Sequence, residues 1–98
     1  MPPQTRRAGG NLFVPLPDLV VGGAPATLVR AANEDRVALI LTDNDPAVNI
    51  RLGDSTVGAV QGVRLYAGAS ITITSTQAIY AISEGAAVTV SMTEELMG

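Results

Sequence analysis

The sequence predicts an all-β fold: a small antiparallel β-sandwich or jelly-roll-like barrel of about seven strands, with an extended N-terminal arm. The 98 residues are 47% hydrophobic but only 3% aromatic, so the apolar content is mainly Val, Ile, Leu and Ala. β-Branched residues favour strands. Short alternating segments separated by turn residues at intervals of about 8–12 residues are typical of sandwiches and small barrels. No segment keeps the 3.6-residue period of a helix.

Residues 1–25 differ from the rest of the chain and are expected to form the extended arm. They hold five of the six prolines and two pairs of glycines, and proline removes donors from helices and sheet ladders. Residues 11–17 are too apolar for an exposed linker, so we expect them to dock on a neighbouring molecule. The alternative is that residues 12–21 fold back as an edge strand on their own domain.

Residues 26–98 are expected to form the body of the sandwich. Residues 36–43 are apolar on both faces, which predicts a central strand. Residues 87–93 alternate, with Val and Met on one face and Thr and Ser on the other. An acidic tail, residues 94–98, is expected to follow them. The expected strands cover residues 26–31, 36–43, 47–52, 63–66, 70–75, 78–83 and 87–93.

The composition removes most catalytic side chains. The chain has no His, Cys or Trp, and all six basic residues are Arg. It therefore has no imidazole proton shuttle, thiol nucleophile or lysine Schiff base. We do not expect an enzyme, and no cofactor is predicted.

One acidic pattern suggests a metal site. Asp43, Asp45 and Asp54 fall at positions 1, 3 and 12 of a calcium loop, but Val48 occupies the position that such a loop reserves for glycine. Residues 43–46 are instead typical of an Asx turn, in which a side-chain oxygen accepts a nearby backbone N–H. We expect the turn and no bound metal.

The charge distribution indicates protein partners. Residues 1–25 carry a net charge of +1 and residues 26–98 a net charge of −4. An acidic body disfavours nucleic acid. Neither a signal peptide nor a membrane helix is expected, because no sufficiently long apolar run exists. Charged residues are only 15% of the chain, so we expect other subunits to cover part of its surface.

The body resembles small virion proteins of tailed bacteriophages. The resemblance is a pattern of strands and turns that covers about two thirds of the chain. It rests on the early strand RVALILT at 36–42, on IRLG at 50–53 and GVRL at 62–65, and most of all on ITSTQAIYAISEGAAVTVSMTEE at 73–95. It implies a β-rich capsid decoration (cement) protein, or a head-fibre or tail-associated module. It also implies a homo-oligomer, with a trimer favoured, whose terminal arms clamp neighbouring capsomers. It supplies no catalytic residue.

Two functions follow as expectations. The first is a structural virion protein, made in the host cytoplasm, that binds the capsid surface at subunit junctions and stabilises the shell. Its partner would be the major capsid protein or another virion protein. The rival is a receptor- or glycan-binding module of a head fibre or tail, with Tyr66 as the candidate contact. The expected partner-interface residues are Arg6, Arg7, Leu12, Phe13, Val14 and Leu16.

Overall fold

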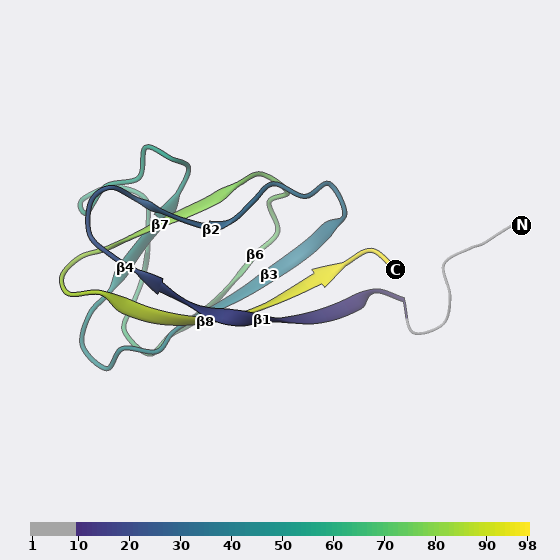
Figure 1. Ribbon diagram of the computed structural model, residues 1–98, viewed down its shortest axis with the longest axis horizontal. Helices are drawn as coiled ribbons and strands as arrows, with labels where there is room; N and C mark the ends of the chain where they lie inside the picture. Colours follow the sequence, from purple (N-terminus) through teal and green to yellow (C-terminus); the bar gives the residue numbers. More distant parts are fainter. Residues whose placement is uncertain (1–9) are drawn as a thin grey trace, which may run out of the picture.

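The computed structural model describes residues 10–98, and every regular element in it is a strand (Figure 1). No helix in this range is long and apolar enough to cross a membrane. The strands are β1 (Leu12–Val21), β2 (Thr27–Arg30), β3 (Arg36–Asp43), β4 (Ile50–Gly53), β5 (Val63–Leu65), β6 (Ser70–Ile73), β7 (Ile79–Ser83) and β8 (Val88–Leu96).

The strands form two antiparallel four-stranded sheets. Sheet A has the order β1-β8-β3-β6 and sheet B the order β2-β7-β4-β5. The first strand therefore pairs with the last, β2 with β7, β3 with β6 and β4 with β5. This nested pairing is the topology of a jelly roll. The two sheets pack face to face as layers of a sandwich and do not close into a barrel (Figure 1). The predicted all-β sandwich is confirmed.

The core lies between the sheets and is built from alternate residues of their strands. Sheet A contributes Val21, Leu39, Leu41, Val88, Val90 and Met92, and sheet B contributes Val29, Ile50, Leu52, Leu65, Ile79 and Ala81. Full burial of a Val, Leu or Ile side chain contributes roughly 1.5–3 kcal/mol relative to an exposed one. The expected central strand, residues 36–43, is β3, which lies between β8 and β6.

The N-terminal segment differs from the expected arm. Residues 12–21 are strand β1, which pairs with β8 along its whole length, from Leu12 opposite Leu96 to Val21 opposite Val88. This is the fold-back alternative, and it raises the strand number from about seven to eight. The prolines at 15 and 17 are compatible with it because β1 is an edge strand, with a neighbour on one side. Residues 1–9 lie outside the described residues.

The C-terminus also differs from the expectation. Strand β8 continues to Leu96, so residues 94–96, three of the five residues of the predicted acidic tail, belong to sheet A. The inward alternation Val88, Val90, Met92 extends to Glu94, whose side chain is fully buried. Leu96 then pairs with both Leu12 and Arg36. Local patterning missed this extension because Glu94 is buried by partners far away in the sequence.

The β4–β5 hairpin depends on one glycine. Gly62 has a φ of 105°, and a Cβ added there would lie 2.6 Å from the carbonyl oxygen of Leu52. An L side chain at this position would combine backbone strain with a clash. Gly62 therefore fixes the return of the chain that sets Leu52 opposite Val63.

Candidate docking surface

The expected interface residues are not all available to a partner. Leu12 and Phe13, at the start of β1, are 57% and 64% exposed. Val14 and Leu16 are half-buried, and Leu16 packs against the core. Arg6 and Arg7 lie outside the described residues. Of the four apolar anchors, Leu12 and Phe13 therefore project into solvent, whereas Val14 and Leu16 also serve their own fold.

The outer face of sheet A carries mostly hydroxyl and apolar side chains. Directly paired residues of antiparallel strands lie on the same face, and register places Thr42 between Ser91 and Ser70, and Ile40 between Thr93 and Thr72. Thr42 Oγ1 and Ser70 Oγ are hydrogen-bonded at 2.7 Å, and Asn44 Nδ2 donates to Ser91 Oγ at 2.6 Å. The uncharged side chains of the outer face include Phe13, Pro15, Val20, Ile40, Thr42, Ser70, Thr72, Thr89, Ser91 and Thr93.

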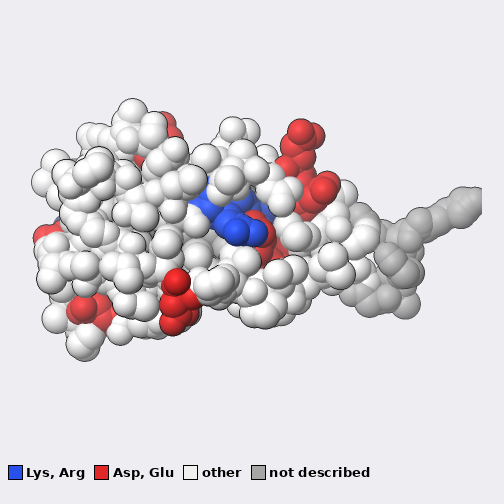
Figure 2. Space-filling view, viewed as in Figure 1, with Lys and Arg blue, Asp and Glu red and all other residues white. Residues whose placement is uncertain are grey.

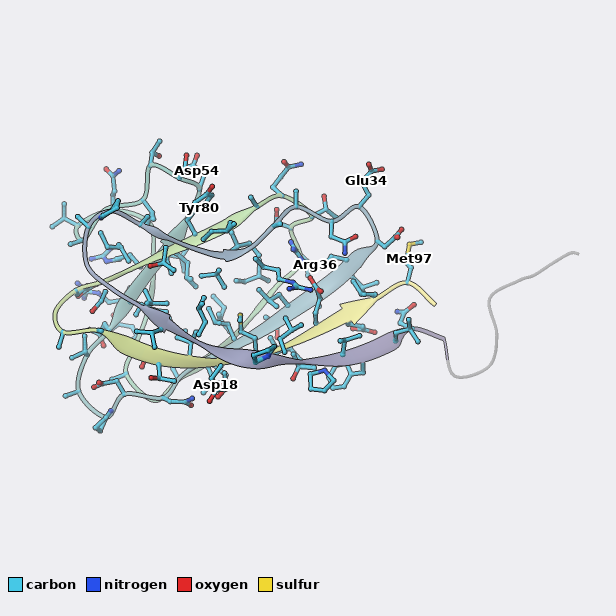
Figure 3. All side chains as sticks on the ribbon, in the orientation of Figure 1. Asp18, Glu34, Arg36, Asp54, Tyr80 and Met97 are labelled. Carbon is cyan, nitrogen blue, oxygen red and sulfur yellow. The ribbon has the colours of Figure 1, made fainter. Side chains whose placement is uncertain are left out.

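Thr89 and Ser91 lie on this face, as the alternation in residues 87–93 predicts. The face carries no basic side chain, because Arg36, the arginine of sheet A, is buried between the sheets. Its charged side chains are Glu95, at one end beside Phe13, and Asp18, at the irregularity of β1. Asp18 points away from the body (Figure 3). A sheet face that is nearly uncharged across four strands has few groups that prefer water to a protein surface.

The outer face of sheet B has a different composition. Glu84 Oε2 accepts hydrogen bonds from Arg51 Nε at 2.6 Å and Arg64 Nε at 2.9 Å. These hydrogen bonds lower the pKa of Glu84. The Arg64 guanidinium also lies 5.7 Å from the ring centroid of Tyr66, which is 60% exposed. Arg51, Arg64 and Glu84 form what we call the surface cluster.

A second arginine cluster is buried between the sheets. Glu94 Oε2 accepts from Arg36 Nε at 2.9 Å, and Glu94 Oε1 accepts from Arg30 Nη2 at 2.9 Å. Burial raises the pKa of Glu94, but the hydrogen bonds from the two arginines outweigh it and leave the pKa below its ordinary value of 4.5. Figure 3 shows Arg36 in the space between the sheets. We call Arg30, Arg36 and Glu94 the buried cluster.

Arg36 also ties two loops to the sandwich. Its Nη1 donates to the carbonyl oxygens of Ser75 and Gln77, each at 2.9 Å, and its Nη2 donates to that of Ala31. All the acceptors are supplied within the chain, so Arg36 holds the β2–β3 and β6–β7 connections in place. On the face seen in Figure 2, the basic atoms form one group next to acidic atoms. Arg30 is the partly exposed arginine of the buried cluster, with 39% of its side-chain surface exposed.

The turn predicted at residues 43–46 is confirmed. Asp43 Oδ1 accepts the N–H of Asp45, and Asp45 Oδ1 accepts those of Ala47 and Val48, each at 2.8 Å. These oxygens therefore bind backbone donors. Within residues 10–98, no three acidic side chains come together in a way that could hold a metal ion. Asp43 is fully buried, and its Oδ2 has no hydrogen-bond partner. Burial raises the pKa of Asp43.

A cleft opens between the sheets on the side opposite β1, where β5 and β6 form the two sheet edges. Its volume is about 270 Å³. Its walls are mainly the apolar side chains of Leu52, Val63, Ile71, Ile73, Ala78 and Ile79, with Asp54, Ser75 and Gln77 also contributing. Sequence patterning gave no sign of it, because the cleft depends on how far sheet B covers sheet A.

The arginine contacts were also missed. Each of the four arginines in residues 26–98 is ion-paired within the chain to Glu84 or Glu94, and no local pattern in the sequence indicates these partners. The chain matches no family model, no curated protein and no solved structure.

Proposed function

We propose that this chain is a structural protein that works by docking, and that its partner is the shell of a tailed-bacteriophage head. The observation that carries the proposal is the outer face of sheet A, a four-strand surface of hydroxyl and apolar side chains without a basic residue. A shell protein that matched this surface would cover side chains that lose little hydration on binding. Arg6 and Arg7 would pair with acidic groups of the shell.

The buried polar groups support a structural role. Glu94 is held between two guanidiniums, and the Asp43 Oδ1 that accepts a hydrogen bond does so within its own turn. Among the described residues, neither carboxylate is paired with a nucleophile or with a second carboxylate across a cleft, as acid–base catalysis would require. These contacts support our proposal of a non-catalytic role.

The proposed mechanism is thermodynamic linkage. A ligand that binds the assembled shell and not its separated subunits stabilises assembly by RT ln(1 + [L]/Kd). If several copies act together as a homo-oligomer, for which we favour a trimer, each added contact increases the avidity without a new kind of contact. The chain would then be found on the capsid surface.

Binding to heads prepared without this chain tests the proposal. A bulky charge in the sheet A face should prevent close approach, so Thr72→Arg and Thr89→Arg should each weaken binding by about tenfold or more. Leu28→Arg is the matched control, since Leu28 is an exposed strand residue of sheet B. Cosedimentation with heads measures occupancy. Equal occupancy for the face variants and the control would remove this face from the mechanism.

Removing residues 1–9 tests Arg6 and Arg7 separately. This truncation leaves β1 in place, whereas removal of residues 1–25 would also take away an edge strand of the sandwich. We expect the truncated chain to stay folded and to bind heads more weakly, with less dependence on salt. Unchanged occupancy and salt dependence would exclude the two arginines.

A specific observation favours the rival function. Tyr66 is exposed beside the Arg64 guanidinium, and the ring face of an exposed tyrosine can pack against a sugar while neighbouring charged groups bond its hydroxyls. A receptor- or glycan-binding module would bind host cells and would lose this binding in Tyr66→Ala. Absence of binding to host cells, or binding that is unaffected by Tyr66→Ala, would reject this function.

A further inference from the structure

The two edges of sheet A end in apolar side chains that their own fold covers incompletely. One inward-facing row runs Leu16, Met92, Leu41, Ile71 from β1 to β6, and the next runs Val14, Glu94, Leu39, Ile73. The middle residues are buried, whereas Val14, Leu16, Ile71 and Ile73 at the ends are half-buried. Both open edges therefore present inward-facing apolar groups at the same level along the strands.

The two edges differ in shape. On the β1 side Leu12 and Phe13 project into solvent, with 57% and 64% of their surfaces exposed. On the β6 side Ile71 and Ile73 line the cleft of about 270 Å³, together with Leu52, Val63 and Ile79. Leu12 of the same molecule cannot fill this cleft, because β8 and β3 separate β1 from β6 within the sheet. The β1 edge of another copy carries the same apolar side chains and is free of this restriction.

We propose that the occupant is the β1 edge of a second copy of this chain. A copy displaced sideways across sheet A, without a shift along the strands, brings Val14 and Leu16 level with Ile73 and Ile71 of its neighbour. The pairings make β1 antiparallel to β6, so this apposition continues the antiparallel order of the sheet. Leu12 follows Val14 on the same inward side of the strand and is placed to enter the cleft.

The contact rests on side-chain burial. Pro15 and Pro17 have no N–H to give to a neighbouring strand, so β1 cannot offer a complete ladder of donors. Charge does not oppose the contact, since residues 12–17 are uncharged and Asp54 is the one charged side chain that lines the cleft.

The two surfaces are different, so the contact is heterologous. A heterologous contact closes into a ring of three or more copies when each copy is also rotated about the strand direction, and without that rotation it continues as an open row. The inference concerns the free protein and does not depend on the identity of the shell. Its failure would leave docking through the outer face of sheet A untouched.

The mass of the full chain in solution is the first test. One chain weighs 10.0 kDa, and light scattering after size exclusion should give a whole-number multiple of this mass, at least threefold. A species with the mass of one chain, or of two chains, at the highest concentration reached would overturn the proposal.

Two surface variants give a sharper test. Leu12→Asp places a charge on the projecting edge, and Val63→Asp places one in the cleft, where Val63 is 57% exposed. Each variant alone should have the mass of a single chain. An equimolar mixture should form a 1:1 complex, because each variant keeps the surface that the other lacks. Val60→Asp is the control, on the same hairpin and 88% exposed but outside the cleft lining, and it should keep the wild-type mass.

Circular dichroism and the thermal midpoint of each variant show whether its fold is retained. If the folded Leu12→Asp and Val63→Asp variants keep the wild-type mass, association uses another surface and the proposal is wrong. A mixture of the two that contains only single chains also contradicts it. Loss of the wild-type mass in Val60→Asp would place the contact on the hairpin tip instead.

Discussion

The interior of the sandwich has a carboxylate at each end, and the two have opposite surroundings. Glu94 on β8 accepts hydrogen bonds from two arginines, whereas Asp43 at the end of β3 has one carboxylate oxygen without a partner. Both side chains are fully buried. The pKa of Glu94 is lowered and that of Asp43 is raised. Burial alone therefore does not decide what a carboxylate contributes to stability; the presence of donors does.

The largest expected effect comes from Glu94→Gln. The substitution keeps the size of the side chain but leaves the buried guanidinium of Arg36 without its counter-charge. Removing one partner of a buried ion pair costs about 3 kcal/mol or more. Urea denaturation at neutral pH measures the free energy of unfolding. A loss below about 1 kcal/mol would mean that the backbone carbonyls around Arg36 are sufficient to hold it.

Acid should remove the contribution of Glu94 in the wild-type protein. Its folded-state pKa lies below the ordinary value of 4.5, so the stabilisation is fully present above about pH 4.5 and is lost as the pH falls through the folded-state pKa. Denaturation midpoints measured between neutral pH and pH 2 should fall steeply in the wild type and less steeply in Glu94→Gln. Parallel curves for the two proteins would contradict this assignment.

Asp43→Asn should change the free energy of unfolding in the opposite direction and stabilise the protein at neutral pH. A group whose pKa is raised in the folded state stabilises the fold at pH values below its ordinary pKa. This stabilisation is lost as the pH rises through the folded-state pKa. At neutral pH the wild type therefore carries the cost of a buried charge with an unpaired oxygen. Asn keeps the Oδ1 acceptor for the Asp45 N–H, so we expect a gain of about 1 kcal/mol or less at pH 7. The gain should vanish near pH 3, and a gain that is independent of pH would argue against it.

The smallest effect is expected from Glu84→Gln. The surface cluster has the same composition as the buried one, since in both a single carboxylate is shared by two arginines. The surface cluster lies on the outer face of sheet B. Partly exposed ion pairs contribute less than buried ones because water and salt screen them. Thermal melts should show a far smaller shift than Glu94→Gln produces, and the shift should shrink further in high salt. Comparable losses from the two variants would mean that burial is not what separates the clusters.

Local patterns in the sequence predicted the elements well but not their long-range partners. Alternation and turn chemistry located the seven strands from β2 to β8, the central position of β3 and the Asx turn at Asp43. The place of β1 depends on pairing with β8, 67 to 84 residues later, and its prolines masked a strand that only an edge position permits. The buried cluster joins Arg30 and Arg36 to Glu94, which are 64 and 58 residues apart, and no local period records such distances.

Of the candidate interface, the sequence predicted the part of the Thr and Ser face that belongs to residues 87–93, because alternation places these side chains on one side of the strand. It also identified Leu12 and Phe13 as apolar residues that a neighbouring molecule is expected to cover. The cleft could not be predicted, since it is formed where β6 of one sheet meets β4 and β5 of the other.

The nested pairing of the strands also determines when the chain can fold during its synthesis. The outermost pair joins Leu12 to Leu96, so β1 cannot complete its pairing until β8 has been synthesised. Strand β8 also separates β1 from β3, and sheet A is incomplete until β8 has left the ribosome. With pairings this distant in sequence, folding is expected in the millisecond-to-second range of β-sandwiches. Until β8 has been synthesised, the Pro-containing β1 segment remains a strand without a partner, and two prolines lower its tendency to pair with the wrong chain.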